Sequence, residues 1–212
     1  MKHKSLSVLF SLLLILAISL SVVRAEVQPA PFAPAAEITV NHNGDLPDAT
    51  GGSGVCETAP GNGNCTLRAA IQTAEYAPGA DVITVLDSIV VIAPATELPW
   101  LVLGDLTIVG NGVYLSGLNA GGGVSGLVIS SAGNKIQGFN IFGFPLHGVL
   151  IYGGDNNIIG VDGNGTGDAA EGNWIFSNIA AGVHVYGNNN RIAGNYIGTG
   201  DGSIASPNRW GV

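Results

Sequence analysis

Charged side chains are scarce in this sequence. Only 10% of the 212 residues are Asp, Glu, Lys or Arg, against about 25% in an average soluble domain. This scarcity excludes a coiled coil and a charged disordered tail, since both depend on dense charge. Basic residues are especially few, with 7 against 15 acidic ones. A chain with a net charge of -8 offers no surface to neutralise phosphates, so we expect no nucleic-acid partner.

Several catalytic motifs are also missing. The chain contains no GxSxG nucleophile elbow, no zinc-ligand spacing and no phosphate-binding glycine loop. Glycine, by contrast, is abundant at 33 residues, and the apolar share is 46%. The sequence therefore predicts frequent turns around a core that can still be buried.

The first 25 residues have the pattern of a secretory signal peptide. Two lysines precede an apolar run over residues 6–20, and Ala25 ends a small-residue cleavage site. The run is shorter than the roughly 20 residues that a membrane-spanning helix needs. We expect a secreted or cell-surface protein without a transmembrane span after cleavage. Residues 26–37, rich in Pro and Ala, are interpreted as a linker.

The only two cysteines are Cys56 and Cys65. In an exported chain such a pair predicts a disulfide, whereas a metal site would need more ligands nearby. The segment that follows predicts a short helix capped by Thr66. Its apolar face consists of Leu67, Ala70, Ile71 and Ala74.

The motif CTLRAA occupies residues 65–70, within a longer segment from 38 to 85. That segment resembles the CSLREA domain, although Thr66 replaces the Ser of the naming motif and Ala69 replaces its Glu. Such domains stand at the start of secreted bacterial right-handed β-helices. The resemblance implies that residues 38–80 form a cap, and it implies no activity for them.

Three later segments repeat one another by spacing alone. They begin at Gly126, Gly148 and Gly182, and each has an Asn eight positions later and an Ile ten positions later. The first two starts are 22 residues apart, and removing residues 161–172 brings the third into register. We expect the aligned asparagines to adopt left-handed turn conformations and to stack as a structural ladder. These are Asn134, Asn156 and Asn190, with Asn173 and Asn195 as a second ladder.

A 22-residue period of alternating apolar residues fits a coil of three short strands and three turns. Residues 81–212 are therefore predicted to form an all-β solenoid of about five coils. They resemble the right-handed parallel β-helix repeats of the pectate-lyase-like superfamily. Trp210 begins what would be another first strand, so we expect the chain to be truncated there. The inward positions of the first strands are Leu127, Ile129, Val149, Ile151, Val183 and Val185.

Aromatic residues fall in the outward columns. Tyr152 and Tyr186 share one column, and Trp174 and Tyr196 share another. Sugar rings stack on such strips, although stacked aromatics also stabilise a coil exterior without a ligand. An extracellular polysaccharide or a cell-envelope component is the predicted partner, and the oligomeric state stays open.

The insertion over residues 161–172 carries the only metal-like spacing. The candidate calcium ligands Asp162, Asn164 and Asp168 stand, together with Thr166, at alternate positions as calcium ligands do. Position twelve, however, is Asn173 rather than the bidentate Glu of an EF-hand. A flexible acidic loop is the alternative to a calcium site. We expect no other cofactor.

The outward columns of the first strands contain no Asp or Glu, which glycoside hydrolysis would need as a pair. Lys135 and Arg191 share a column without an acidic cluster, and His184 lacks a positioned acid. We therefore expect no catalytic residues and interpret the chain as a structural or adhesive module that binds carbohydrate. The alternative is a fragment of a polysaccharide lyase or glycoside hydrolase whose catalytic coils lie beyond residue 212.

Overall fold

The computed structural model describes residues 35–200 and 202–212. The predicted signal peptide and most of the predicted linker lie outside these residues. Glu37, the last residue of that linker, is already the first residue of strand β1 (Glu37–Val40). Within the described part of the chain, no helix combines the length and apolar character needed to cross a membrane.

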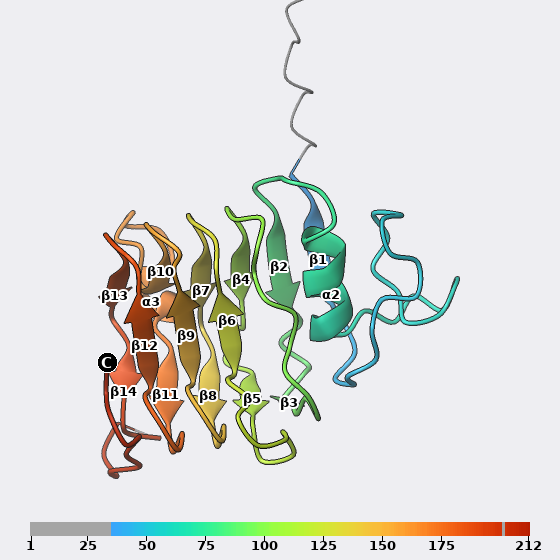
Figure 1. The fold of residues 1–212 in the computed structure, drawn as a ribbon. Coiled ribbons are helices and arrows are strands. Elements are labelled where there is room, and N and C mark those ends of the chain that lie inside the picture. Colours follow the sequence, from blue (N-terminus) through green and yellow to red (C-terminus); the bar gives the residue numbers. More distant parts are fainter. Residues whose placement is uncertain (1–34, 201) are drawn as a thin grey trace, which may run out of the picture. The chain divides into compact units, whose positions relative to one another are not determined.

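From residue 127 onward the chain visits three parallel sheets in a fixed order (Figure 1). We call one such passage a coil. The first of these coils contains β6 (Leu127–Ile129), β7 (Lys135–Gln137) and β8 (Asn140–Phe142). The second contains β9 (Val149–Tyr152), β10 (Ile158–Gly160) and β11 (Trp174–Phe176). The third contains β12 (Val183–Tyr186), β13 (Arg191–Ala193) and β14 (Tyr196–Ile197).

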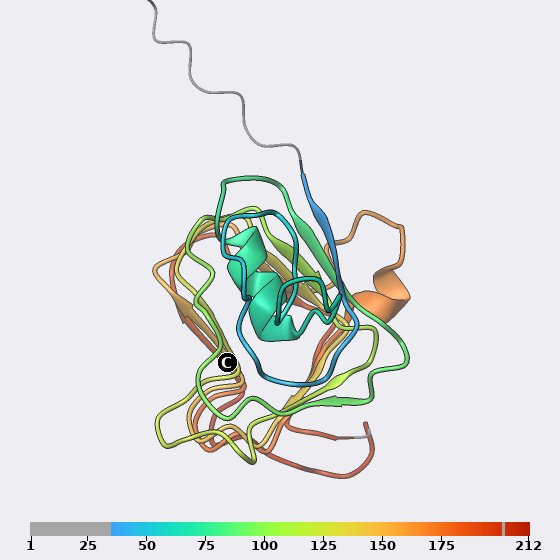
Figure 2. The ribbon, with the colours of Figure 1, turned by 90° about the vertical axis from the view of Figure 1, so that its right-hand side faces the viewer.

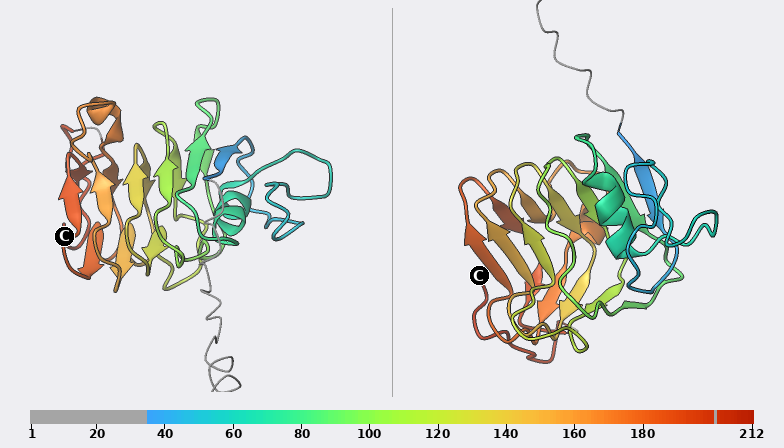
Figure 3. Two further views of the ribbon diagram at one scale, coloured as in Figure 1. Left: turned by 90° about the horizontal axis from the view of Figure 1, so that it is seen from above. Right: turned by 45° about the vertical axis from the view of Figure 1, so that its right-hand side comes forward.

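The sheets extend back into the predicted cap. The strand β1 pairs in parallel with β2 (Val82–Val85), which pairs with β4 (Thr107–Val109). Sheet A therefore runs β1, β2, β4, β7, β10 and β13. Sheet B runs β3 (Val91–Ile92), β5 (Tyr114–Ser116), β8, β11 and β14, and sheet C runs β6, β9 and β12. The rows of arrows in Figure 3 follow these sheets.

Sheet C continues beyond its named strands. Leu101 forms a parallel bridge with Ile129, and Trp210 forms one with Ala181. The N–H of Gly182 donates to the Trp210 carbonyl at 2.9 Å. The residues from Trp210 onward thus enter the path of a first strand, as predicted.

The core consists of like side chains stacked from coil to coil. In sheet A, Ile38, Ile83, Ile108, Ile136 and Ile159 lie in register, and the last four are fully buried. Side chains of this β-branched kind pack well on a pleated surface. The predicted inward positions of sheet C are also confirmed, fully for Leu127, Ile129, Val149, Ile151 and Val183 and in part for Val185.

The predicted helix is α2 (Leu67–Ala74), and its predicted cap and apolar face are both confirmed. The Thr66 hydroxyl accepts the N–H of Ala69 at 3.1 Å, which satisfies one free donor at the helix start. Seen along the stack, α2 lies across the coil interior (Figure 2). The predicted disulfide between Cys56 and Cys65 is present just before it.

The first asparagine ladder differs from the prediction at one position. The side-chain oxygen of Asn157, not that of Asn156, accepts the backbone N–H of Asn134 at 2.8 Å. The oxygen of Asn190 in turn accepts the N–H of Asn157, also at 2.8 Å. The ladder is therefore Asn134, Asn157 and Asn190, and the prediction of Asn156 was wrong.

The reason is one additional residue in the turn before β10. Gly154 and Gly187 occupy matching places next to the ladder, so Gly153 is the surplus residue and moves the ladder by one position. The predicted left-handed conformation is found one residue before the ladder asparagines. It is adopted by Asn156 and Asn189, with φ of 56° in each, and not by the ladder asparagines that follow them.

The second predicted ladder is confirmed, since the Asn195 side-chain oxygen accepts the N–H of Asn173 at 3.0 Å. A third ladder was not foreseen. The Asn208 oxygen accepts the N–H of Asn178 at 2.9 Å, and the Asn178 oxygen accepts the N–H of Phe144 at 3.0 Å. Each ladder satisfies buried amide groups at one turn of the coil.

Candidate functional site

An exposed row of aromatic side chains crosses the outer face of sheet C. Tyr152 and Tyr186 lie in register, as predicted, with ring centroids 6.0 Å apart. Trp100 extends the row, with its ring 6.1 Å from that of Tyr152. The three side chains are 42% (Trp100), 56% (Tyr152) and 56% (Tyr186) exposed. We call Trp100, Tyr152 and Tyr186 the aromatic row.

The aromatic row is not a flat strip. The Tyr152 ring stands at 64° to the Trp100 ring and at 81° to the Tyr186 ring. The rings therefore meet edge to face, an arrangement that the charge distribution of aromatic rings favours. The Trp100 indole N–H is fixed by a hydrogen bond to the Glu97 carboxylate at 2.9 Å. Sequence reasoning missed Trp100 because it precedes the recognisable repeat.

The second predicted pair belongs to a different sheet. Trp174 and Tyr196 lie in register on sheet B, with ring centroids 4.9 Å apart and planes tilted by 46°. Asn140 precedes Trp174 in the same column. The structure thus confirms each predicted pair as neighbours but places the two pairs on different sheets.

Two histidines adjoin the aromatic row. The buried His147 ring contacts His184 edge to face, with centroids 4.5 Å apart, and His184 stacks on Tyr186 at 4.5 Å. The Nδ1 atom of His147 accepts the N–H of Ala181 at 3.2 Å. Burial, and secondarily the neighbouring His184, lowers the pKa of His147. The lowered pKa favours the neutral form, in which Nδ1 is free to accept this hydrogen bond.

The insertion folds around its acidic residues and contains a short helix, α3 (Asp168–Glu171). Oxygens of Asp162, Asp168 and Glu171 come within 4.8 Å of one another. The Lys135 ammonium donates to Asp162 at 2.6 Å, and this bond lowers the pKa of that carboxyl. A lysine thus already supplies positive charge here. Asn164 donates its side-chain N–H to Asp162 at 3.0 Å, and the calcium site remains a prediction.

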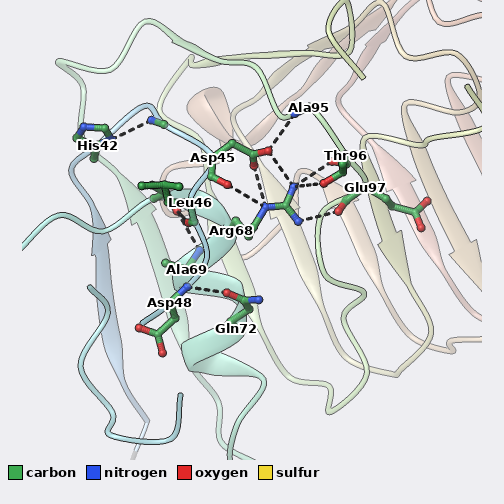
Figure 4. A network of polar contacts seen from close by, with 12 residues as sticks. His42, Asp45, Leu46, Asp48, Arg68, Ala69, Gln72, Ala95, Thr96 and Glu97 are labelled. Carbon is green, nitrogen blue, oxygen red and sulfur yellow. Dashed lines mark hydrogen bonds and ion pairs between the residues drawn. The ribbon is translucent and has the colours of Figure 1, made fainter. Parts of the chain in front are cut away.

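A polar clamp in the cap was not foreseen, although its central residue belongs to the CTLRAA motif (Figure 4). The Arg68 guanidinium donates to the Asp45 carboxylate at 2.9 and 3.1 Å. It also donates to the carbonyls of Thr96 and Glu97 at 3.0 and 2.8 Å. Asp45 additionally accepts the N–H of Ala95 at 2.9 Å. Arg68 therefore ties α2 to two loops far apart in sequence.

The described strands contain few carboxyl side chains that could act in catalysis. Among the described strands, Glu37 at the start of β1 is the only residue with a carboxyl side chain. Lys135 and Arg191 flank Ile158 in sheet A, and their column contains no carboxylate beside them. The described strands therefore contain no pair of carboxyl groups of the kind that sugar hydrolysis uses, and the cluster of three close carboxyl groups in the described chain belongs to the insertion.

Comparisons of the chain with known protein families, with curated proteins and with solved structures find no match. The resemblance of the cap to the CSLREA domain and of the coils to pectate-lyase-like repeats therefore remains a prediction.

Proposed function

We propose that this chain is a secreted, right-handed parallel β-helix module that binds an extracellular polysaccharide along the aromatic row. In this proposal the cap resembles a CSLREA domain and covers one end of the coils. The module holds its ligand at a cell surface or outside the cell and carries no catalytic site.

The exposure of the aromatic row carries this proposal. Trp100, Tyr152 and Tyr186 expose large apolar surfaces, and each touches the next across successive turns of the chain. Solvent-exposed aromatic side chains can stack on sugar rings, because sugar rings have apolar faces and polar rims. A row that follows the stacking direction repeats its contacts along a polymer, which a single exposed aromatic would not do.

Connectivity supports the handedness. Each return to the same sheet joins two parallel strands, as from β6 to β9, after the chain has passed through the other two sheets. Parallel crossovers of this kind are right-handed in about 98% of cases, because strand twist favours that direction.

The test is binding of the full chain to an array of extracellular polysaccharides, followed by calorimetry on the best ligand. Because stacking and area burial are both lost, Tyr152→Ala/Tyr186→Ala and Trp100→Ala should each weaken binding about tenfold. Tyr76→Ala is the matched control, since Tyr76 is an exposed tyrosine of the cap. Unchanged affinity in both row variants would overturn the proposed site, and depolymerisation of the ligand would overturn the non-catalytic interpretation.

Secretion has its own test. Expression of the full chain in a bacterial host, with N-terminal sequencing of the exported product, should give Glu26 as the first residue. Retention of an intact N-terminus in the cytoplasm would contradict the proposed localisation.

A further inference from the structure

A cleft of about 460 Å³ lies beside α3, where the chain turns from sheet A to sheet B. We propose that this cleft, which we call the corner cleft, binds an amino-sugar unit of the polysaccharide through its ammonium group and its ring. The inference rests on the proposed carbohydrate-binding function and names its ligand class. The residues that carry it are Asp87, Asn111, Asn140 and Trp174.

The insertion builds one wall of the corner cleft. In the first coil Gly138 alone separates Gln137 from Phe139, whereas residues 161–172 fill the matching place in the second coil. The enlarged turn contacts the first coil, where the N–H of Gly138 donates to the Glu171 carbonyl at 3.0 Å. Gly138 is required at this contact, since an added Cβ would lie 3.0 Å from a backbone oxygen of α3 at a φ of 68°. The corner cleft therefore depends on the insertion, since coils without an insertion at this turn would lack this wall.

Three side chains of the corner cleft present unpaired acceptor oxygens, namely Asp87, Asn111 and Asn140. One side-chain N–H of Asn111 donates to the Val85 carbonyl at 2.8 Å. One side-chain N–H of Asn140 donates to the Gly112 carbonyl at 2.6 Å. Their side-chain oxygens accept no hydrogen bond from the described residues. The Asp87 carboxylate likewise forms neither a hydrogen bond nor an ion pair with them. Ligand hydroxyl and ammonium groups can donate to these oxygens, and the ring and hydroxyl oxygens of a sugar can accept the remaining N–H groups of Asn111, Asn140 and Trp174.

Trp174 supplies the aromatic face. It lies directly beside Asn140 on sheet B, and Tyr196 contacts it from the next coil with centroids 4.9 Å apart. A tryptophan face attracts both the C–H face of a sugar ring and a neighbouring cation. An acceptor oxygen next to such a face matches a ring that carries hydroxyl and amine substituents.

The charges nearby favour a cationic ligand. Lys135 is paired with Asp162, and Arg191 donates its Nε–H to the Val161 carbonyl at 3.0 Å. The charge of Lys135 is thus balanced by Asp162, whereas the Asp87 carboxylate forms no ion pair with the described residues. The net charge of -8 on the whole chain also disfavours a polyanionic ligand.

The experiment compares binding of the full chain to a deacetylated glucosamine oligomer and to its N-acetylated counterpart, by calorimetry at mildly acidic pH. The two oligomers share ring geometry but differ in the ammonium group. We expect the deacetylated oligomer to bind about tenfold more tightly, and Asp87→Asn to remove most of that difference. Trp174→Ala should weaken both oligomers, whereas Trp174→Phe should retain part of the affinity. Asp155→Asn, in the turn before β10, is the charge control, because asparagine keeps a side-chain oxygen that can accept the Asn188 N–H bound there at 2.7 Å.

Equal affinity for the two oligomers, or affinity unchanged in both Asp87→Asn and Trp174→Ala, would overturn the corner cleft as an amino-sugar site. Stronger binding of a lysine-rich peptide than of the deacetylated oligomer would overturn the sugar assignment. A failure confined to the cleft variants would leave the aromatic row intact, because Trp100→Ala and Tyr152→Ala/Tyr186→Ala test it separately. Thermal unfolding of each variant shows whether a loss of binding reflects a loss of fold.

Discussion

The side-chain oxygen of Asn157 accepts two hydrogen bonds from Asn134, one from its backbone N–H at 2.8 Å and one from its side-chain N–H at 2.9 Å. Both residues are fully buried. A single oxygen therefore satisfies two donors in the preceding coil that have no access to water. The coils are joined at this turn by side-chain amides as well as by the strand ladders on either side.

Replacing Asn157 should accordingly be costly. Asn157→Ala leaves both donors of Asn134 without this acceptor, and we expect the free energy of unfolding to fall by about 2–4 kcal/mol. Chemical denaturation measures this change. Asn156→Gly is the control, because Asn156 is exposed, left-handed and outside the ladder, and glycine tolerates that conformation. A comparable loss in the control would contradict the corrected ladder.

The Arg68 clamp should resist conservative replacement. Arg68→Lys cannot reproduce the planar fork that reaches Asp45 and two carbonyls together, and we expect a loss of about 1–3 kcal/mol in unfolding free energy. Arg68→Ala should cost more, because it leaves Asp45 without its charge partner. Arg209→Ala, which removes only a contact with the Trp210 ring, should lie within about 0.5 kcal/mol of the unaltered protein. Equal stability of Arg68→Lys and the unaltered protein would argue against the clamp.

His147 should make stability depend on pH. Its folded pKa lies below the unfolded value of about 6.5, so the unfolded chain binds more protons in the interval between them. Stability is therefore complete above about pH 6.5 and falls as the pH drops towards the folded pKa. In His147→Phe this part of the slope should disappear, at the cost of an unpaired Ala181 N–H. Unfolding midpoints measured from pH 7.5 to pH 5 give the slope, and His42→Phe should retain it.

Reduction of the Cys56–Cys65 bond should loosen the cap more than the coils. Opening this short loop should lower the unfolding free energy by about 2–3 kcal/mol. In Cys56→Ser/Cys65→Ser, hydrogen exchange should accelerate around residues 41–66, where the disulfide-closed loop is anchored. Exchange in β7 and β10 should change little, since these strands lie within the stack. Uniform acceleration throughout the chain would show that the cap and the coils unfold together.

Much of the architecture could be predicted because it depends on local pattern. The alternation of apolar residues specified the inward columns, and the spacing of Thr66 and the residues that follow it specified α2. Tyr152 and Tyr186 could be placed together because each lies four residues after the glycine that begins its repeat, and paired parallel strands align equivalent positions. The ladder position of Asn157 could not be predicted in this way. The extra residue Gly153 moves the ladder one position along the chain, and the sequence still has an asparagine, Asn156, at the position that the repeat predicts.

The sequence by itself determined the coil, its three strands, its buried columns and its disulfide, since each follows from periodicity or from a pair of residues close in the chain. Only the tertiary structure decided which segments meet. It brought Trp100 to Tyr152, joined Arg68 to Asp45, and folded the insertion back over Gly138 beside Trp174. These contacts depend on how turns of unequal length stack on one another, and no local pattern encodes that geometry.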